Sequence, residues 1–300
     1  MKTLHSIQLL LIALLISYSC SGKPSNNNTQ NQVDSIPADA VKFTYDISKN
    51  SYDVEKRAIM FDGIINDTIP INVFFDTGWL NVYNIVIPDT LKNNIGKDSC
   101  TLRIKGRFGR KLQIAYRKKD SPWSKYFGQN TAAIGWDYFD DKIIEISYKH
   151  QYLRELKDTA GLEKNGFKRV QIYNLRGWKG VPVIIYVQGK KIVEVLMLDT
   201  GYNGCIDLNY DIASKYHVNL DNIRHATSIS THTPFQKCFI ESDSIIVGYS
   251  LAKKLPIGFL TSNKMEMPGS GLIGNQFFEN FTVVFDFKNF NLYLRPTVNS

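Results

Sequence analysis

Two short motifs in this 300-residue sequence place aspartates where they could do chemistry: residues 76–78 and 199–201 both read Asp-Thr-Gly. A single copy is weak evidence, because these residue types are common in turns that end strands. Two carboxyl groups a few ångströms apart cannot both ionise easily, so they hold one proton between them. The ionised group can then take a proton from water while the protonated group donates one. This general acid–base chemistry requires no metal, covalent intermediate or cofactor.

The two motifs lie in matching contexts. Residues 58–78 and 181–201 each read as an apolar strand, a polar turn, a second strand and then Asp-Thr-Gly, with equivalent residues 123 positions apart. Downstream, Ala-Ile-Gly at 133–135 and Leu-Ile-Gly at 272–274 each precede further strand-like segments, 139 positions apart. The sequence therefore predicts an internal duplication whose second copy is about sixteen residues longer.

Most of the predicted elements are strands. Val, Ile, Phe and Tyr alternate in short runs of about four to eight residues, bounded by Gly, Asn, Asp and Pro. Helix signals are brief: residues 88–95, residues 209–217, and a turn after each apolar-apolar-Gly. The predicted fold class is all-β, mostly antiparallel with few short helices, in two similar lobes that share a cleft.

These residues resemble the aspartic proteases of the pepsin and retropepsin group over most of residues 55–295. Phe-Asp-Thr-Gly and Leu-Asp-Thr-Gly match the paired active-site loops of that family, and the two apolar-apolar-Gly segments match elements downstream of those loops. The resemblance implies a bilobed, pepsin-like fold in which Asp76 and Asp199 meet as the catalytic dyad of an aspartic endopeptidase. Because both halves lie in one chain, it also implies a monomer that acts on a peptide or protein substrate.

The resemblance assigns supporting roles beside the aspartates. Thr77 and Thr200 would bond across to the opposite loop, and Gly78 and Gly201 would let the loops approach without a Cβ clash. The base and the acid are not assigned to individual aspartates, since such a pair titrates as a unit.

The residue after each Asp-Thr-Gly departs from the family, which usually has Ser, Thr or Ala there. This chain has Trp79 and Tyr202. Either aromatic side chain could wall a substrate pocket, or block the cleft of an inactive relative, and both interpretations stay open. The second gives the alternative function: a catalytically inactive, protease-like lipoprotein that binds a peptide or protein at the cell envelope.

Residues 101–119 are the predicted flap, the hairpin that closes over substrate in this family. Apolar residues alternate with basic ones on either side of residues 106–109, and Phe108 is the aromatic residue nearest to the expected tip. The segment holds eight Lys or Arg residues and no acid. It fits a solvated hairpin, a surface that steers acidic peptides, or one attracted to an anionic membrane.

Composition excludes several classes of protein. The chain is 43% hydrophobic, which excludes disorder over most of its length, and its only conspicuous apolar run lies at the N-terminus, which excludes a multi-span membrane protein. A net charge of +8 is too modest to indicate nucleic-acid binding. Residues 269–274 spell a dinucleotide fingerprint, but no βαβ pattern surrounds them. No metal or cofactor site is predicted.

The N-terminus predicts export. Lys2 precedes an apolar run at residues 9–16, too short to span a bilayer but typical of a signal peptide. Ser-Tyr-Ser-Cys at residues 17–20 resembles a bacterial lipoprotein signal in which Cys20 carries the lipid, although Leu is usual where Ser17 stands. We expect a lipid anchor in the bacterial cell envelope, with a soluble periplasmic or secreted protein as the alternative.

The predicted boundaries are a signal peptide at 1–19, a flexible tether at 20–40, a first lobe at 41–155, an interlobe connection at 156–178 and a second lobe at 179–300. Export permits a disulfide between Cys205 and Cys238, which would leave Cys100 unpaired. Burial of all three as small apolar residues is the favoured interpretation.

Overall fold

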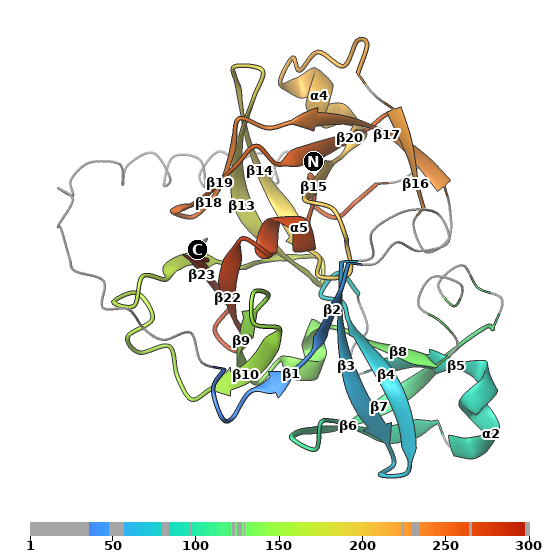
Figure 1. The fold of residues 1–300 in the computed structure, drawn as a ribbon. Helices are drawn as coiled ribbons and strands as arrows, with labels where there is room; N and C mark the ends of the chain where they lie inside the picture. Colours follow the sequence, from blue (N-terminus) through green and yellow to red (C-terminus); the bar gives the residue numbers. More distant parts are fainter. Residues whose placement is uncertain are drawn as a thin grey trace. The chain divides into compact units, whose positions relative to one another are not determined.

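The computed structural model describes residues 36–47, 57–79, 84–95, 98–119, 121, 124, 128, 130–223, 225–229, 234–263 and 266–297. Within these ranges the chain is mostly β, with largely antiparallel sheets and a few short helices, which confirms the predicted fold class (Figure 1). None of the helices in these ranges is long and apolar enough to cross a membrane. The predicted signal peptide and Cys20 lie outside the described residues.

One sheet gathers seven strands of the first half in the order β2-β3-β4-β8-β5-β7-β6 (Figure 1). Because β3 also pairs with β6, six of these strands close into a ring. The strands are β2 (Thr44–Asp46), β3 (Ala58–Ile65), β4 (Ile69–Phe75), β5 (Asn84–Pro88), β6 (Ser99–Ile104), β7 (Phe108–Arg117) and β8 (Thr131–Ile134).

A second sheet belongs to the second half, in the order β16-β17-β20-β15-β21-β14-β13-β18-β19, with β12 also paired to β13. Its strands are β12 (Tyr173–Leu175), β13 (Trp178–Val187), β14 (Lys190–Leu198), β15 (Ile206–Leu208), β16 (His225–Ile229), β17 (Pro234–Glu241), β18 (Ser244–Val247), β19 (Ser250–Lys253), β20 (Pro256–Leu260) and β21 (Gly271–Ile273).

The two sheets repeat one topology. In the first sheet β3-β4-β8-β5-β7-β6 are neighbours, and in the second β13-β14-β21-β15-β20-β17 follow in the same order. The pair β4–β8 is parallel, and so is its equivalent β14–β21. The pairs β5–β7 and β15–β20 are also both parallel. This strand-for-strand match confirms the predicted internal duplication. The strands β16, β18 and β19 have no counterpart in the described part of the first half.

A third sheet is built by both halves, in the order β1-β10-β9-β22-β23-β11. The antiparallel pair β9–β22 lies at its centre and joins the halves. β11 comes from the predicted interlobe connection and pairs with β23. The strands are β1 (Val41–Lys42), β9 (Ile143–Ser147), β10 (Tyr152–Leu156), β11 (Lys168–Gln171), β22 (Phe281–Asp286) and β23 (Asn291–Pro296).

The helices are short and occur where the sequence predicts them. Residues 88–95 contain η1 (Asp89–Leu91) and α2 (Lys92–Ile95), and residues 209–217 contain α4 (Tyr210–Lys215). A short helix follows each apolar-apolar-Gly: η2 (Trp136–Phe139) in the first half and α5 (Asn275–Phe278) in the second.

Alternation of apolar residues along the strands builds the core. On β13, Val181, Val183, Ile185 and Val187 are completely buried, while the residues between them are partly exposed. Each such side chain contributes about 1.5–3 kcal/mol when removed from water. The two residues of the β13–β14 turn, Gln188 and Gly189, both have positive φ, as a tight hairpin turn requires.

Residues 101–119 form the predicted hairpin, β6–β7, and contacts with β3 hold its turn. Lys105 in that turn pairs with Asp62 of β3 at 2.6 Å. Phe108 is 6% exposed, and its ring centre lies 5.5 Å from that of Phe139. The prediction of Phe108 as a flap or cleft residue is therefore wrong, because the β3–β6 pairing closes the sheet and turns this side chain into the core.

Part of the hairpin's positive charge is neutralised locally. Arg103 pairs with Asp67 at 2.7 Å, and Arg110 pairs with Asp140 at 2.7 Å. Exposed pairs such as Arg103–Asp67 add little stability, but they reduce the net charge that this surface presents to solvent.

Candidate active site

The two Asp-Thr-Gly loops are placed by equivalent strands. β4 ends at Phe75 and β14 ends at Leu198, directly before Asp76 and Asp199. The Asp76 N–H donates to the Ile134 carbonyl at 3.0 Å. The Asp199 N–H donates to the Ile273 carbonyl, also at 3.0 Å. Each apolar-apolar-Gly segment therefore holds the first residue of its own Asp-Thr-Gly loop.

Thr77 and Thr200 lock the two loops together by reciprocal hydrogen bonds. The Thr77 N–H donates to Oγ1 of Thr200 at 3.0 Å, and the Thr200 N–H donates to Oγ1 of Thr77 at 2.9 Å. Each hydroxyl then donates across the interface, Thr77 to the Leu198 carbonyl and Thr200 to the Phe75 carbonyl, both at 3.0 Å. Both threonines are almost completely buried, so losing any of these bonds would leave buried polar groups unpaired.

Gly78 and Gly201 lie directly against the opposite aspartates. A Cβ added to Gly78 would be 2.5 Å from Cγ of Asp199, and a Cβ on Gly201 would collide with the Asp76 carboxyl group in the same way. Each glycine N–H donates to Oδ1 of the aspartate in its own loop at 2.9 Å. The two carboxyl groups hydrogen bond to each other, and both residues stay partly exposed.

The environment of the dyad favours a shared proton. Burial raises the pKa of Asp76 well above its usual value, and repulsion from the neighbouring Asp199 carboxyl adds to that shift. Burial also raises the pKa of Asp199. The N–H groups of the residues that follow each aspartate oppose these increases by donating to the ionised form. The dyad can therefore keep one proton at mildly acidic pH while the other carboxyl is ionised.

Trp79 turns into the first lobe. Its side chain packs against a small apolar cluster that includes Phe74, Val86 and Ala133. Its indole Nε1 is buried and has no hydrogen-bond partner in the described part of the chain. Part of the Asp76 surface stays exposed beside it.

Tyr202 turns into the second lobe. Its ring joins an apolar cluster with Met197, Leu260 and Leu272. Its hydroxyl accepts a hydrogen bond from Nζ of Lys237 at 3.0 Å. Trp79 and Tyr202 therefore occupy equivalent sequence positions in very different surroundings.

Three residues that the sequence did not single out also hold the site. Nε1 of Trp178, at the start of β13, donates to the Gly78 carbonyl at 3.1 Å. The buried Asn275 donates through Nδ2 to the Thr200 carbonyl at 2.6 Å and accepts from the Tyr148 hydroxyl at 2.8 Å. The one available signal was position: Asn275 directly follows the second apolar-apolar-Gly.

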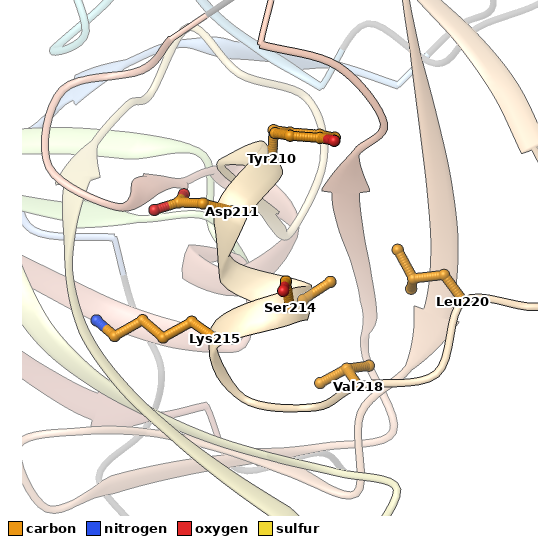
Figure 2. Close-up of a pocket in the computed structure, with 7 residues that line it drawn as sticks. Tyr210, Asp211, Ser214, Lys215, Val218 and Leu220 are labelled. Carbon is orange, nitrogen blue, oxygen red and sulfur yellow. The ribbon is translucent and has the colours of Figure 1, made fainter.

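Other predicted features lie away from the dyad. Cys100, Cys205 and Cys238 are all buried as free thiols, which fits the favoured interpretation. No group of three or more His, Cys, Asp or Glu residues that could hold a metal occurs in the described part of the chain. Figure 2 shows a separate hollow beside α4, lined by Tyr210, Lys215 and Leu220 among others, to which neither Asp-Thr-Gly loop contributes.

Comparison with known proteins identifies the fold. No protein-family model matches the chain, and no curated protein matches its sequence. An aspartic proteinase from Irpex lacteus has a similar structure, with a TM-score of 0.52 over 86% of this chain and 97% of that one, at 12% sequence identity. A retropepsin-like aspartic protease from Rickettsia conorii covers 43% of this chain and 89% of its own, at 19% identity and a TM-score of 0.33. The first likeness shows that the chain has a bilobed, pepsin-like acid-protease fold.

Proposed function

We propose that this protein is an aspartic-type endopeptidase whose dyad is Asp76 and Asp199. The observation that carries the proposal is the contact between these two carboxyl groups, which equivalent loops from the two halves bring together. The reciprocal threonine bonds make that contact rigid, and the fold it shares with a known aspartic proteinase supports it.

In the proposed reaction, a water bound between the carboxyl groups attacks the carbonyl carbon of the scissile peptide bond. The ionised carboxylate takes a proton from this water while the protonated carboxyl donates its proton to the carbonyl oxygen, which gives a tetrahedral diol. The diol then collapses: the C–N bond breaks, the nitrogen leaves with a proton from the dyad, and one diol hydroxyl gives its proton to the other carboxylate as the new carboxyl group forms. The pair ends with one proton, as it began.

The proposed reaction has a definite pH dependence. It needs one proton on the pair, so it fails once that proton is lost. Because burial raises the pKa of both carboxyl groups, the singly protonated pair persists to higher pH than two free aspartates would allow. Cleavage is expected at acidic to near-neutral pH and should decline at alkaline pH.

The packing of Trp79 and Tyr202 favours hydrolysis over the inactive alternative. Each side chain packs within its own lobe, and both aspartates stay partly exposed. A substrate backbone could therefore approach the carboxyl groups from the exposed side. Peptide binding without cleavage remains the alternative that the experiment below separates.

The proposed location is the bacterial cell envelope, where a lipid on Cys20 would anchor the protein and residues 20–40 would act as its tether. This part of the proposal is supported by the signal-like sequence of residues 1–20 alone. A substrate would then be an exported peptide or protein that meets the enzyme at the membrane.

A peptide library incubated with the purified protein from about pH 3 to pH 8 tests the activity. Cleavage should disappear in Asp76→Asn and in Asp199→Asn, persist with a chelator, and be unchanged in Asp62→Asn, an exposed aspartate of β3. No cleavage at any pH, or cleavage that survives both dyad changes, contradicts the proposal. Peptide binding that survives both changes in a protein that cleaves nothing would establish the alternative.

A further inference from the structure

A buried ion pair lies in the second lobe and takes no part in the proposed acid–base steps. Nζ of Lys237, on β17, lies 2.7 Å from Oδ2 of Asp207, on β15. Their side chains are only 4% and 1% exposed. Removing two charges from water is costly, so such a pair needs further hydrogen bonds around it.

Tyr202 supplies part of those contacts, while Oδ1 of Asp207 has no hydrogen-bond partner among the described residues. Lys237 donates to its hydroxyl at 3.0 Å, and the hydroxyl is also hydrogen bonded to Asp207. The Lys237 ammonium lies 5.1 Å from the centre of the tyrosine ring. The ring lies across Gly204 and Gly274, where a Cβ on Gly274 would be 2.5 Å from its Cδ1 atom. The tyrosine is therefore fixed both at its hydroxyl and along its ring.

The contacts that hold the Tyr202 side chain also hold its backbone N–H, which lies next to Asp199. Tyr202 follows the second Asp-Thr-Gly directly, and its N–H donates to the Asp199 carbonyl at 3.2 Å. Burial raises the pKa of Asp199, and the same N–H opposes that increase by favouring the ionised carboxylate. On its other side, the Tyr202 carbonyl accepts the Asn275 N–H at 2.9 Å.

Among the described residues of the first lobe, no equivalent cluster lies at its own Asp-Thr-Gly loop. Trp79 takes the place of Tyr202 and packs against apolar side chains, and its Nε1 meets no hydrogen-bond partner within the ranges that the structure describes. The lysine, the aspartate and the tyrosine therefore act on only one of the two catalytic loops.

We propose that Tyr202, Lys237 and Asp207 form a positioning cluster that holds the Tyr202 N–H against the Asp199 carboxylate. The role rests on the proposed function, because it is defined by the dyad. The titratable groups that face Asp199 are Asp76 and Asp207, and Cys205 faces Tyr202.

Tyr202→Phe is the sharpest variant, because it removes one hydroxyl and keeps the ring. We expect kcat to fall about tenfold with KM unchanged within about twofold, because the carboxylate loses alignment while the substrate contacts stay. Tyr216→Phe is a matched control: its hydroxyl also bonds a carboxylate, Glu194, that is paired with a lysine, Lys215. That control should leave kcat unchanged. Equal kcat values in Tyr202→Phe and Tyr216→Phe would overturn the proposal.

A measurement that needs no turnover separates this inference from the proposed function. The ¹³C resonances of the aspartate carboxyl groups can be titrated in the wild type, Tyr202→Phe and Tyr216→Phe, with Asp199→Asn to assign them. A weaker N–H contact should raise the apparent pKa of the dyad in Tyr202→Phe by about half a unit. If this shift occurs in a protein that cleaves no peptide, the positioning cluster stands and the proposed function fails. If cleavage occurs but neither kcat nor the titration changes, the cluster has no positioning role.

The double variant Lys237→Met with Asp207→Asn tests the ion pair itself without leaving one buried charge alone. It should reproduce the loss of kcat seen in Tyr202→Phe. A double variant with the wild-type kcat would overturn the part assigned to the two charged residues.

Discussion

Replacing Gly78 by alanine tests how closely the two Asp-Thr-Gly loops approach each other. The new Cβ would lie 2.5 Å from Cγ of Asp199, and 2.6 and 2.8 Å from its two oxygens. Ordinary contacts begin at 3.4 Å, so the loops would have to part by about 0.9 Å. The bonds made by Thr77 and Thr200, at 2.9 and 3.0 Å, would then stretch to about 3.8 and 3.9 Å, beyond hydrogen-bond range.

Two measurements follow from this displacement. We expect the free energy of unfolding in urea to fall by about 1–3 kcal/mol, as for other overpacked buried sites. We expect kcat/KM for a cleaved peptide to fall about 100-fold, because a shift near 1 Å misaligns the reacting groups. Gly109→Ala is the control, since its new Cβ would meet chiefly the flexible end of the Arg103 side chain. If Gly78→Ala matches that control in both measurements, the loops are not apposed as described.

Three further changes probe the same site. Asp199→Asn should match the wild type in its free energy of unfolding near pH 3.5 and exceed it by about 1–2 kcal/mol at pH 7.5. Burial raises the pKa of this aspartate, so at any pH above the pKa of a free carboxyl group its ionisation destabilises the folded state. Equal urea midpoints for the two proteins at both pH values would contradict this. Thr77→Val should lower the free energy of unfolding by about 2–4 kcal/mol, because two buried polar groups lose their hydrogen-bond partner. Thr77→Ser keeps the hydroxyl and should lower it by less than about 1 kcal/mol. Equal losses in the two variants would show that the hydroxyl is unimportant. Trp178→Phe should lower the free energy of unfolding by about 1 kcal/mol, because the hydrogen bond to the Gly78 carbonyl is lost. An unchanged midpoint of thermal unfolding would contradict that value.

The duplication and the dyad could be predicted because their signals are local and repeated. Each strand-turn-strand unit is indicated by apolar residues that recur at alternate positions, and each unit ends in the same tripeptide. The short helices after Gly135 and Gly274 were predictable for the same reason, since each follows a fixed neighbour in the chain.

The error at Phe108 has a physical cause. An alternating hairpin looks the same in sequence whether it covers a cleft or closes a sheet, because the deciding contact is the distant pairing of β3 with β6. The strand pattern around Phe108 therefore predicted the hairpin but not its role.

The position of Lys237 in the sequence indicates a buried charge, which the overall composition does not reveal. Phe235, Lys237 and Phe239 alternate along β17, so the lysine shares a strand face with two aromatic residues. A charged residue at such a position demands a buried partner. Which residue supplies it could not be read from the sequence, because Asp207 lies thirty positions away on another strand.

The repeated strand order of the two lobes has an evolutionary consequence. A site made by two identical subunits must carry the same residue on both sides of its axis, so any change there is made twice. Fusion of the two copies into one polypeptide removes that constraint, and each side can diverge separately. Trp79 opposite Tyr202, and Trp136 opposite Asn275, record such divergence: the loops still obey twofold symmetry, while their surroundings have become specialised.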